Sequence, residues 1–164
     1  MISSFNWRKF TKKIAIEASI QAVYDAWTVP QVLEQWFLSK AVFFDNRQPV
    51  SAVANIDTGH EYEWQWFAQE TSETGTVLEA NGSDLLSFTF AGNCKVDVKM
   101  YEEEGYTIIE LTQKDIPDDE KSRVSIWLDC AFGWAFYLVN LKAFLEHRVD
   151  LRHKDKKINK VVNG

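Results

Sequence analysis

The chain has 164 residues, of which 46% are hydrophobic and 26% charged, as expected for one globular domain with a substantial core. A formal net charge of -6 argues against nucleic acid as the main partner. The two cysteines form no CxxC motif, and the sequence indicates neither a signal peptide nor an apolar run of the roughly 18 residues that a membrane span needs. We therefore expect a reduced, cytoplasmic protein without membrane insertion.

The first quarter of the chain predicts one strand and two short helices. Residues 10–18 alternate between apolar and polar side chains, as in a half-buried strand. Ser19 is placed to cap a helix whose apolar residues recur at helical spacing over residues 20–27. Pro30 fits the first turn of a second short helix, because its fixed φ suits that position.

The middle of the chain predicts an antiparallel meander. Alternating apolar residues are separated by turn sequences, of which Asn81-Gly82-Ser83-Asp84 is of hairpin type because Asn and Gly accept positive φ. The expected strands are residues 41–45, 60–68, 75–80, 86–90, 96–100 and 106–113, with room for one more short strand near residues 53–56. With the first strand, this gives a sheet of about six to seven strands.

A long apolar helix follows the strands and is the most informative feature of the sequence. It is expected to begin near Pro117, with acidic residues in a first turn where the helix dipole favours negative charge, and its first turns could form a separate piece. Gly133 costs about 1 kcal/mol relative to Ala in a helix interior, so we expect close approach of a strand or bulky ring there. The stripe expected to be buried comprises Trp127, Ala131, Trp134, Leu138, Leu141 and Leu145.

This order of elements predicts a single α+β domain in which a curved antiparallel sheet wraps around the long C-terminal helix. The expected core covers residues 10–151, and residues 152–164 form a basic tail that we expect to be flexible and solvated. A curved sheet that grips a helix leaves a cavity between them, and such cavities commonly bind small molecules.

Two segments carry a resemblance to a known family. "IEASIQAVYDAWTVPQVLEQWF" and "GWAFYLVNLKAFLEH" resemble the end motifs of START-like (SRPBCC) helix-grip proteins, most closely the branch named for the activator of heat-shock protein 90 ATPase. The resemblance spans about Phe10 to Leu151 and implies a deep cavity between the sheet and the last helix. The residues that match the family motifs are Trp27, Trp36 and Phe37 at the two-helix corner and Gly133 and Trp134 in the last helix.

The sequence offers little catalytic chemistry. His60, His147 and His153 are too scattered for a metal site, and neither a nucleophile elbow nor a phosphate-binding glycine loop occurs, so we assign no catalytic residue, metal or cofactor. Cys94 and Cys130 are expected to be buried apolar fillers.

Two carboxylates leave one catalytic hypothesis open. Asp129 or Glu110 could act as an acid or base if it faced an apolar cavity. The simpler interpretation is that both side chains face solvent, because each lies opposite the apolar face of its element.

The aromatic residues therefore carry the main functional prediction, which is non-catalytic binding of a small hydrophobic or aromatic molecule. Each ring could instead fill the core, and Tyr62, Tyr137 and Asn140 are the expected polar anchors. The residues expected to line the cavity are Trp27, Trp36, Phe37, Tyr62, Trp64, Trp66, Phe88, Phe90, Trp127, Trp134, Tyr137 and Leu138.

Two other functions remain as alternatives. One is a cyclase or hydrolase that uses a cavity carboxylate. The other is a protein that contacts a chaperone and modulates its ATPase. Eukaryotic co-chaperones of the resembled branch carry a separate N-terminal domain, which we expect this chain of 164 residues to lack.

Overall fold

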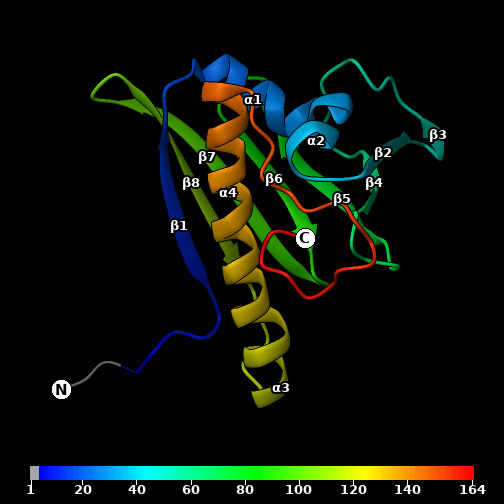
Figure 1. Cartoon of the computed structure of the whole chain (residues 1–164), viewed down its shortest axis with the longest axis vertical. Coiled ribbons are helices and arrows are strands. Elements are labelled where there is room, and N and C mark those ends of the chain that lie inside the picture. Colours follow the sequence, from blue (N-terminus) through cyan, green and yellow to red (C-terminus); the bar gives the residue numbers. More distant parts are fainter. Residues whose placement is uncertain (1–3) are drawn as a thin grey trace.

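The structure, a computed structural model, describes residues 4–164. Its antiparallel sheet has eight strands in the order β1-β8-β7-β6-β5-β4-β2-β3, with the helices on one face (Figure 1). The strands are β1 (Phe10–Ile16), β2 (Lys40–Asp45), β3 (Gln48–Pro49), β4 (Glu61–Gln65), β5 (Glu73–Ala80), β6 (Leu85–Phe90), β7 (Cys94–Glu103) and β8 (Tyr106–Lys114).

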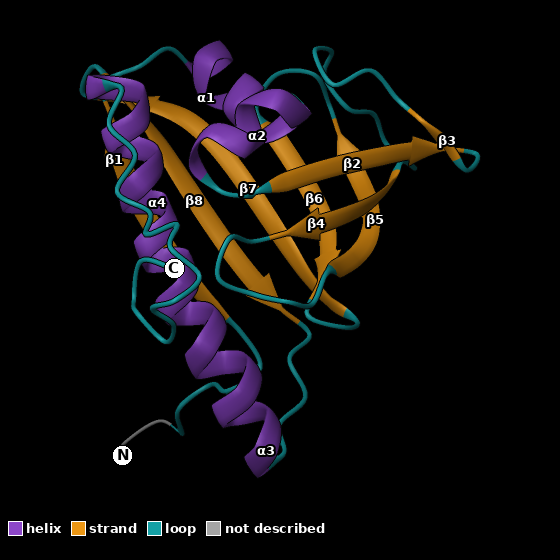
Figure 2. Cartoon of the chain, turned by 45° about the vertical axis from the view of Figure 1, so that its right-hand side comes forward, coloured by secondary structure: helices purple, strands orange, loops and turns teal. Residues whose placement is uncertain are grey.

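The predicted α+β fold is confirmed, with one strand more than expected. The additional strand β3 has only two residues, so it is too short to show an alternating pattern in the sequence. The strand suggested near residues 53–56 is wrong, since this segment belongs to a loop. The pairing register of β5 with β6 shifts between Val77 and Glu79, and irregularities of this kind bend a sheet. Strands β2 and β4 accordingly run across the direction of β7 and β8 (Figure 2).

Helices α1 (Ile20–Thr28) and α2 (Pro30–Trp36) follow β1 as predicted and pack over the sheet. The Ser19 hydroxyl accepts a hydrogen bond of 3.1 Å from the Ala22 N–H and caps α1. Pro30 occupies the first turn of α2. The indole N–H of Trp36 donates to the Ala26 carbonyl at 2.9 Å, which joins the two helices through a buried hydrogen bond.

The last helix is continuous from Glu120 to His147, so its first turns do not form a separate piece. It comprises α3 (Glu120–Ser122), the π-helical segment η1 (Arg123–Leu128) and α4 (Asp129–His147), which crosses the face of the sheet (Figure 1). Most of the predicted stripe is buried, while its two end members are only half-buried. By length and composition the helix could cross a membrane, but its buried stripe makes it the core helix of this domain.

The segment after α4 returns to the domain. Arg152 is buried, contrary to the expectation of a solvated tail. Its guanidinium donates to the carbonyl oxygens of Leu38 and Glu34 at 2.9 and 3.0 Å and pairs with the Asp150 carboxylate. These contacts hold the start of the segment against α2 and the residues that follow it.

Candidate ligand-binding cavity

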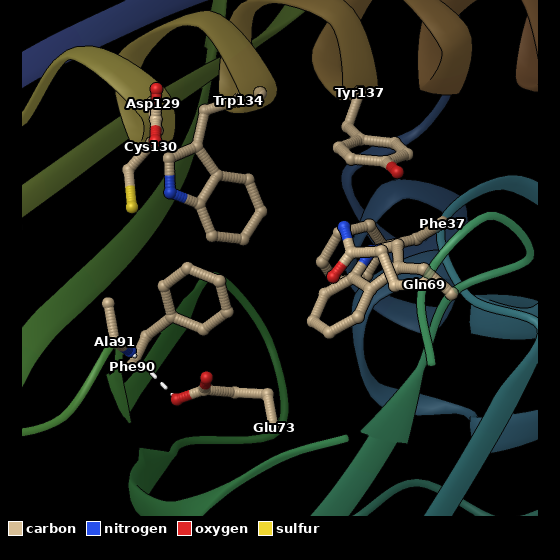
Figure 3. A pocket seen from close by; sticks show the side chains of 11 residues that line it. Phe37, Gln69, Glu73, Phe90, Ala91, Asp129, Cys130, Trp134 and Tyr137 are labelled. Carbon is tan, nitrogen blue, oxygen red and sulfur yellow. Dashed lines mark hydrogen bonds between the residues drawn. The ribbon is translucent and has the colours of Figure 1, made fainter. Parts of the chain in front are cut away.

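A cavity of about 230 Å³ lies between the first half of α4 and one end of the sheet (Figure 3). Three neighbouring strands contribute to it near their termini: Trp66 follows β4, Glu73 begins β5 and Phe90 ends β6. The loop residue Gln69 and Phe37, which follows α2, complete the wall. The cavity therefore forms only where segments distant in sequence meet.

Aromatic rings make up most of its wall. Phe37 lies at the centre of this group, with its ring centroid 5.6 Å from that of Trp66, 5.3 Å from Trp134 and 4.9 Å from Tyr137. Phe90 lies 5.1 Å from Trp134 on the other side. Ring pairs at these separations attract one another beyond the burial of their area, so the wall is held in place by its own packing.

Gly133 leaves space open in the wall, and the reason predicted for this glycine is wrong. A Cβ built at this position meets no atom within 4 Å, so neither a strand nor a ring approaches it closely. Because Gly133 lines the cavity one residue before Trp134, its missing side chain instead widens the cavity along α4.

The polar lining consists of side chains that the functional prediction did not include. Gln69, Glu73, Asp129 and Cys130 all border the cavity. The Glu73 carboxylate accepts a hydrogen bond of 2.9 Å from the backbone N–H of Ala91, which fixes its position beside the end of β6 (Figure 3).

The two carboxylates weighed from the sequence have different positions. Asp129 is exposed but contributes to the cavity wall. Glu110 forms an ion pair with Lys13 at 3.3 Å on the face of the sheet opposite the core. Glu110 is therefore excluded from any chemistry inside the cavity.

The two cysteines also differ. Cys94 is buried, as predicted, whereas Cys130 is half-buried and lines the cavity. Burial raises the pKa of the Cys130 thiol to about 11, so the thiol is protonated at neutral pH and is a weak nucleophile there.

The three polar side chains expected to anchor a ligand are occupied by other partners. The Tyr62 hydroxyl donates to the carbonyl oxygen of Thr89, and that of Tyr137 donates to the carbonyl oxygen of Gly164. Asn140 donates to the carbonyl oxygen of Trp36 at 2.6 Å and accepts from the Leu151 N–H at 2.7 Å. Of these three side chains, only Tyr137 lines the cavity, through its ring.

The twelve residues predicted to line the cavity separate into three groups. Five are on its wall: Phe37, Trp66, Phe90, Trp134 and Tyr137. Six others fill the core around it: Trp27, Trp36, Tyr62, Trp64, Phe88 and Leu138. Trp127 lies apart, with its ring 5.1 Å from Phe5 and 5.4 Å from Trp7, both in the segment before β1.

The sheet, the two short helices and the aromatic cavity under α4 define an α+β protein of the helix-grip class. The family model described as "Activator of Hsp90 ATPase homolog 1-like protein" matches residues 17–146, and the chain belongs to this family. A comparison with curated proteins gives no match.

Solved structures show the same fold at low sequence identity. A protein from Staphylococcus saprophyticus, SSP2350, is 19% identical with a TM-score of 0.70, over 88% of this chain and 96% of that one. The Aha1 dimer from Colwellia psychrerythraea is 17% identical with a TM-score of 0.68, over 85% and 96%. DynU16, from the dynemicin biosynthetic locus, is 17% identical with a TM-score of 0.68, over 90% and 50%.

Proposed function

We propose that this domain binds a small hydrophobic or aromatic molecule in the cavity under α4 without transforming it. The observation that carries the proposal is the space opened by Gly133 within a wall of five aromatic rings. Apolar walls with a few polar groups are the usual composition of small-molecule sites. Membership of a helix-grip family, in which hydrophobic ligands are common, supports the same function.

The surroundings of the polar lining support a non-catalytic role. The catalytic alternative needs a carboxylate enclosed by apolar groups, whereas Asp129 is exposed. Glu73 is half-buried, but one of its oxygens is already engaged by the Ala91 N–H. The thiol of Cys130 is held in its neutral form at pH 7 by its raised pKa.

Filling the cavity from α4 tests the proposal directly. Gly133→Leu places a side chain into the open space, and N-phenylnaphthylamine, a neutral dye that brightens in apolar surroundings, reports binding. Ala135→Leu is the matched control, because Ala135 is on the exposed side of the same helix. We expect wild type and Ala135→Leu to bind the dye and folded Gly133→Leu to lose it; equal binding by all three would contradict the proposal.

The family description favours one second candidate, which is stimulation of a chaperone ATPase. The solved structure of an Aha1 dimer among the structural neighbours points in the same direction. Measuring the ATPase rate of an Hsp90-type chaperone with saturating protein tests this candidate. An unchanged rate would reject it and leave the cavity proposal untouched.

A further inference from the structure

We infer that the cavity selects a ligand with a positively charged group on an apolar, ring-bearing body, such as an organic ammonium. This inference rests on the proposed function, because it concerns the chemistry of the molecule bound under α4. Two features of the cavity carry it: the sign of its charged groups and the aromatic faces between them.

The charged lining is entirely acidic. Of the eleven residues around the cavity, Glu73 and Asp129 are ionisable to carboxylates, and the remainder include neither Lys nor Arg. The two acids come from different elements, the start of β5 and the start of α4, and lie on opposite sides of the cavity (Figure 3). Among residues 4–164, neither carboxylate forms an ion pair.

The space between these acids is bounded by Phe37, Trp66, Phe90 and Trp134. The face of an aromatic ring is the negative part of its quadrupole, so it attracts an organic cation as well as an apolar group. Two carboxylates around electron-rich rings thus favour a cation over a neutral molecule of the same shape, and they repel an anion.

The exposure of the lining also gives the ligand an orientation. Phe37 and Trp134 are buried, whereas Glu73 is half-buried and Asp129 is exposed. The apolar body of the ligand therefore packs against the buried rings. Its ammonium group lies nearer the opening, where the carboxylates and water both solvate it.

Three naphthalene probes of similar size and different charge test the inference by isothermal titration calorimetry. They are naphthylmethylammonium, naphthylmethanol and naphthoate. We expect the wild-type protein to bind the ammonium about tenfold more tightly than the alcohol, with naphthoate weakest. Added salt should reduce the advantage of the ammonium and leave the alcohol unchanged, because salt screens charges near solvent.

Neutralising the two cavity acids tests whether they cause the preference for the ammonium. The variant Glu73→Gln/Asp129→Asn keeps an oxygen for the Ala91 N–H and should bind ammonium and alcohol about equally, because it removes both negative charges. Glu79→Gln is the matched control, since Glu79 is an exposed acid on β5 outside this cavity, and it should keep the preference.

The outcomes separate the two proposals. If wild type binds the alcohol and the ammonium equally, or if the preference survives in the double variant, charge selection is overturned while ligand binding stands. If wild type binds none of the three probes, the proposed function fails and the inference fails with it.

Discussion

The indole N–H of Trp134 donates a hydrogen bond of 2.9 Å to the side-chain oxygen of Gln113, and both residues are buried. This bond connects α4 to β8 and fixes the orientation of one cavity wall. A buried indole N–H without an acceptor is costly, so the geometry of the wall depends on a residue that does not line the cavity.

Gln113→Leu removes this acceptor and should lower the free energy of unfolding by about 1–3 kcal/mol. Urea denaturation followed by Trp fluorescence measures the change, and Gln65→Leu on exposed β4 surface serves as control. The loss should shrink in a Trp134→Phe background, where no N–H remains to be satisfied. The same loss in both backgrounds would show that the bond contributes nothing.

Gly75 should not tolerate a side chain. It lies opposite Tyr62 across β4 and β5, and a Cβ at position 75 would lie 2.6 Å from Cζ of Tyr62 and 2.7 Å from Oγ1 of Thr89. Gly75→Ala should therefore destabilise the domain by about 1–3 kcal/mol, as overpacking does. Thermal denaturation provides the measurement, and the penalty should be smaller when Tyr62 is replaced by Leu; a neutral Gly75→Ala would contradict the close approach.

Gly133→Ala should have the opposite effect. Its Cβ meets no neighbour within 4 Å, and glycine in a helix interior costs about 1 kcal/mol relative to alanine. We expect the unfolding free energy to rise by up to about 1 kcal/mol, measured under the conditions used for Gly75→Ala. A decrease would mean that the space beside Gly133 is filled.

The stability of the domain should depend on pH through Asp150. Burial alone would raise the pKa of this carboxyl, but hydrogen bonds from Arg152, Lys154 and Asn140 outweigh burial and lower it. A lowered folded-state pKa adds stability that is complete above the unfolded pKa of about 4 and is lost as pH falls toward the folded value.

Asp150→Asn should therefore be less stable than wild type at neutral pH by about 2 kcal/mol, because the buried guanidinium of Arg152 loses its anionic partner. The difference in unfolding free energy between the two proteins should narrow from about pH 5 downward. A constant difference across this range would assign the loss to packing and not to charge.

Cys130 should react slowly although it borders an open cavity. With its pKa raised to about 11 by burial, little thiolate exists at neutral pH. In a Cys94→Ser protein, alkylation by iodoacetamide at pH 7 should be at least about tenfold slower than that of free cysteine, as followed by mass spectrometry. Bound naphthylmethanol should slow it further; a rate equal to that of the free thiol would contradict the burial.

The regular parts of this fold were predictable because they obey simple periods. The alternation through Tyr62, Trp64 and Trp66 places all three on the buried face, and Ser19 and Pro30 have the capping and first-turn positions expected of them. These features depend on residues that are close together in the sequence, so a single sequence is enough to predict where they lie.

The cavity was only partly predictable, because its lining depends on contacts between segments that are distant in the sequence. A buried ring that fills the core, such as Trp64, and one that faces the cavity, such as Trp66, have the same sequence pattern. Glu73 lies at the start of a strand, where the alternating pattern does not show which side chains face inward. The sequence around Gly133 also does not show whether a neighbour packs against this glycine or leaves space beside it.

The burial of Arg152 also has a consequence for how the cavity is completed. Its guanidinium lies 5.1 Å from the ring centroid of Phe67, so the segment after α4 braces the loop that carries Trp66 and Gln69. A pocket braced in this way is complete only when the segment after α4 has docked, so it is absent from partly unfolded molecules. The proposed ligand would therefore bind only the folded domain and would shift the folding equilibrium toward it as the ligand concentration rises.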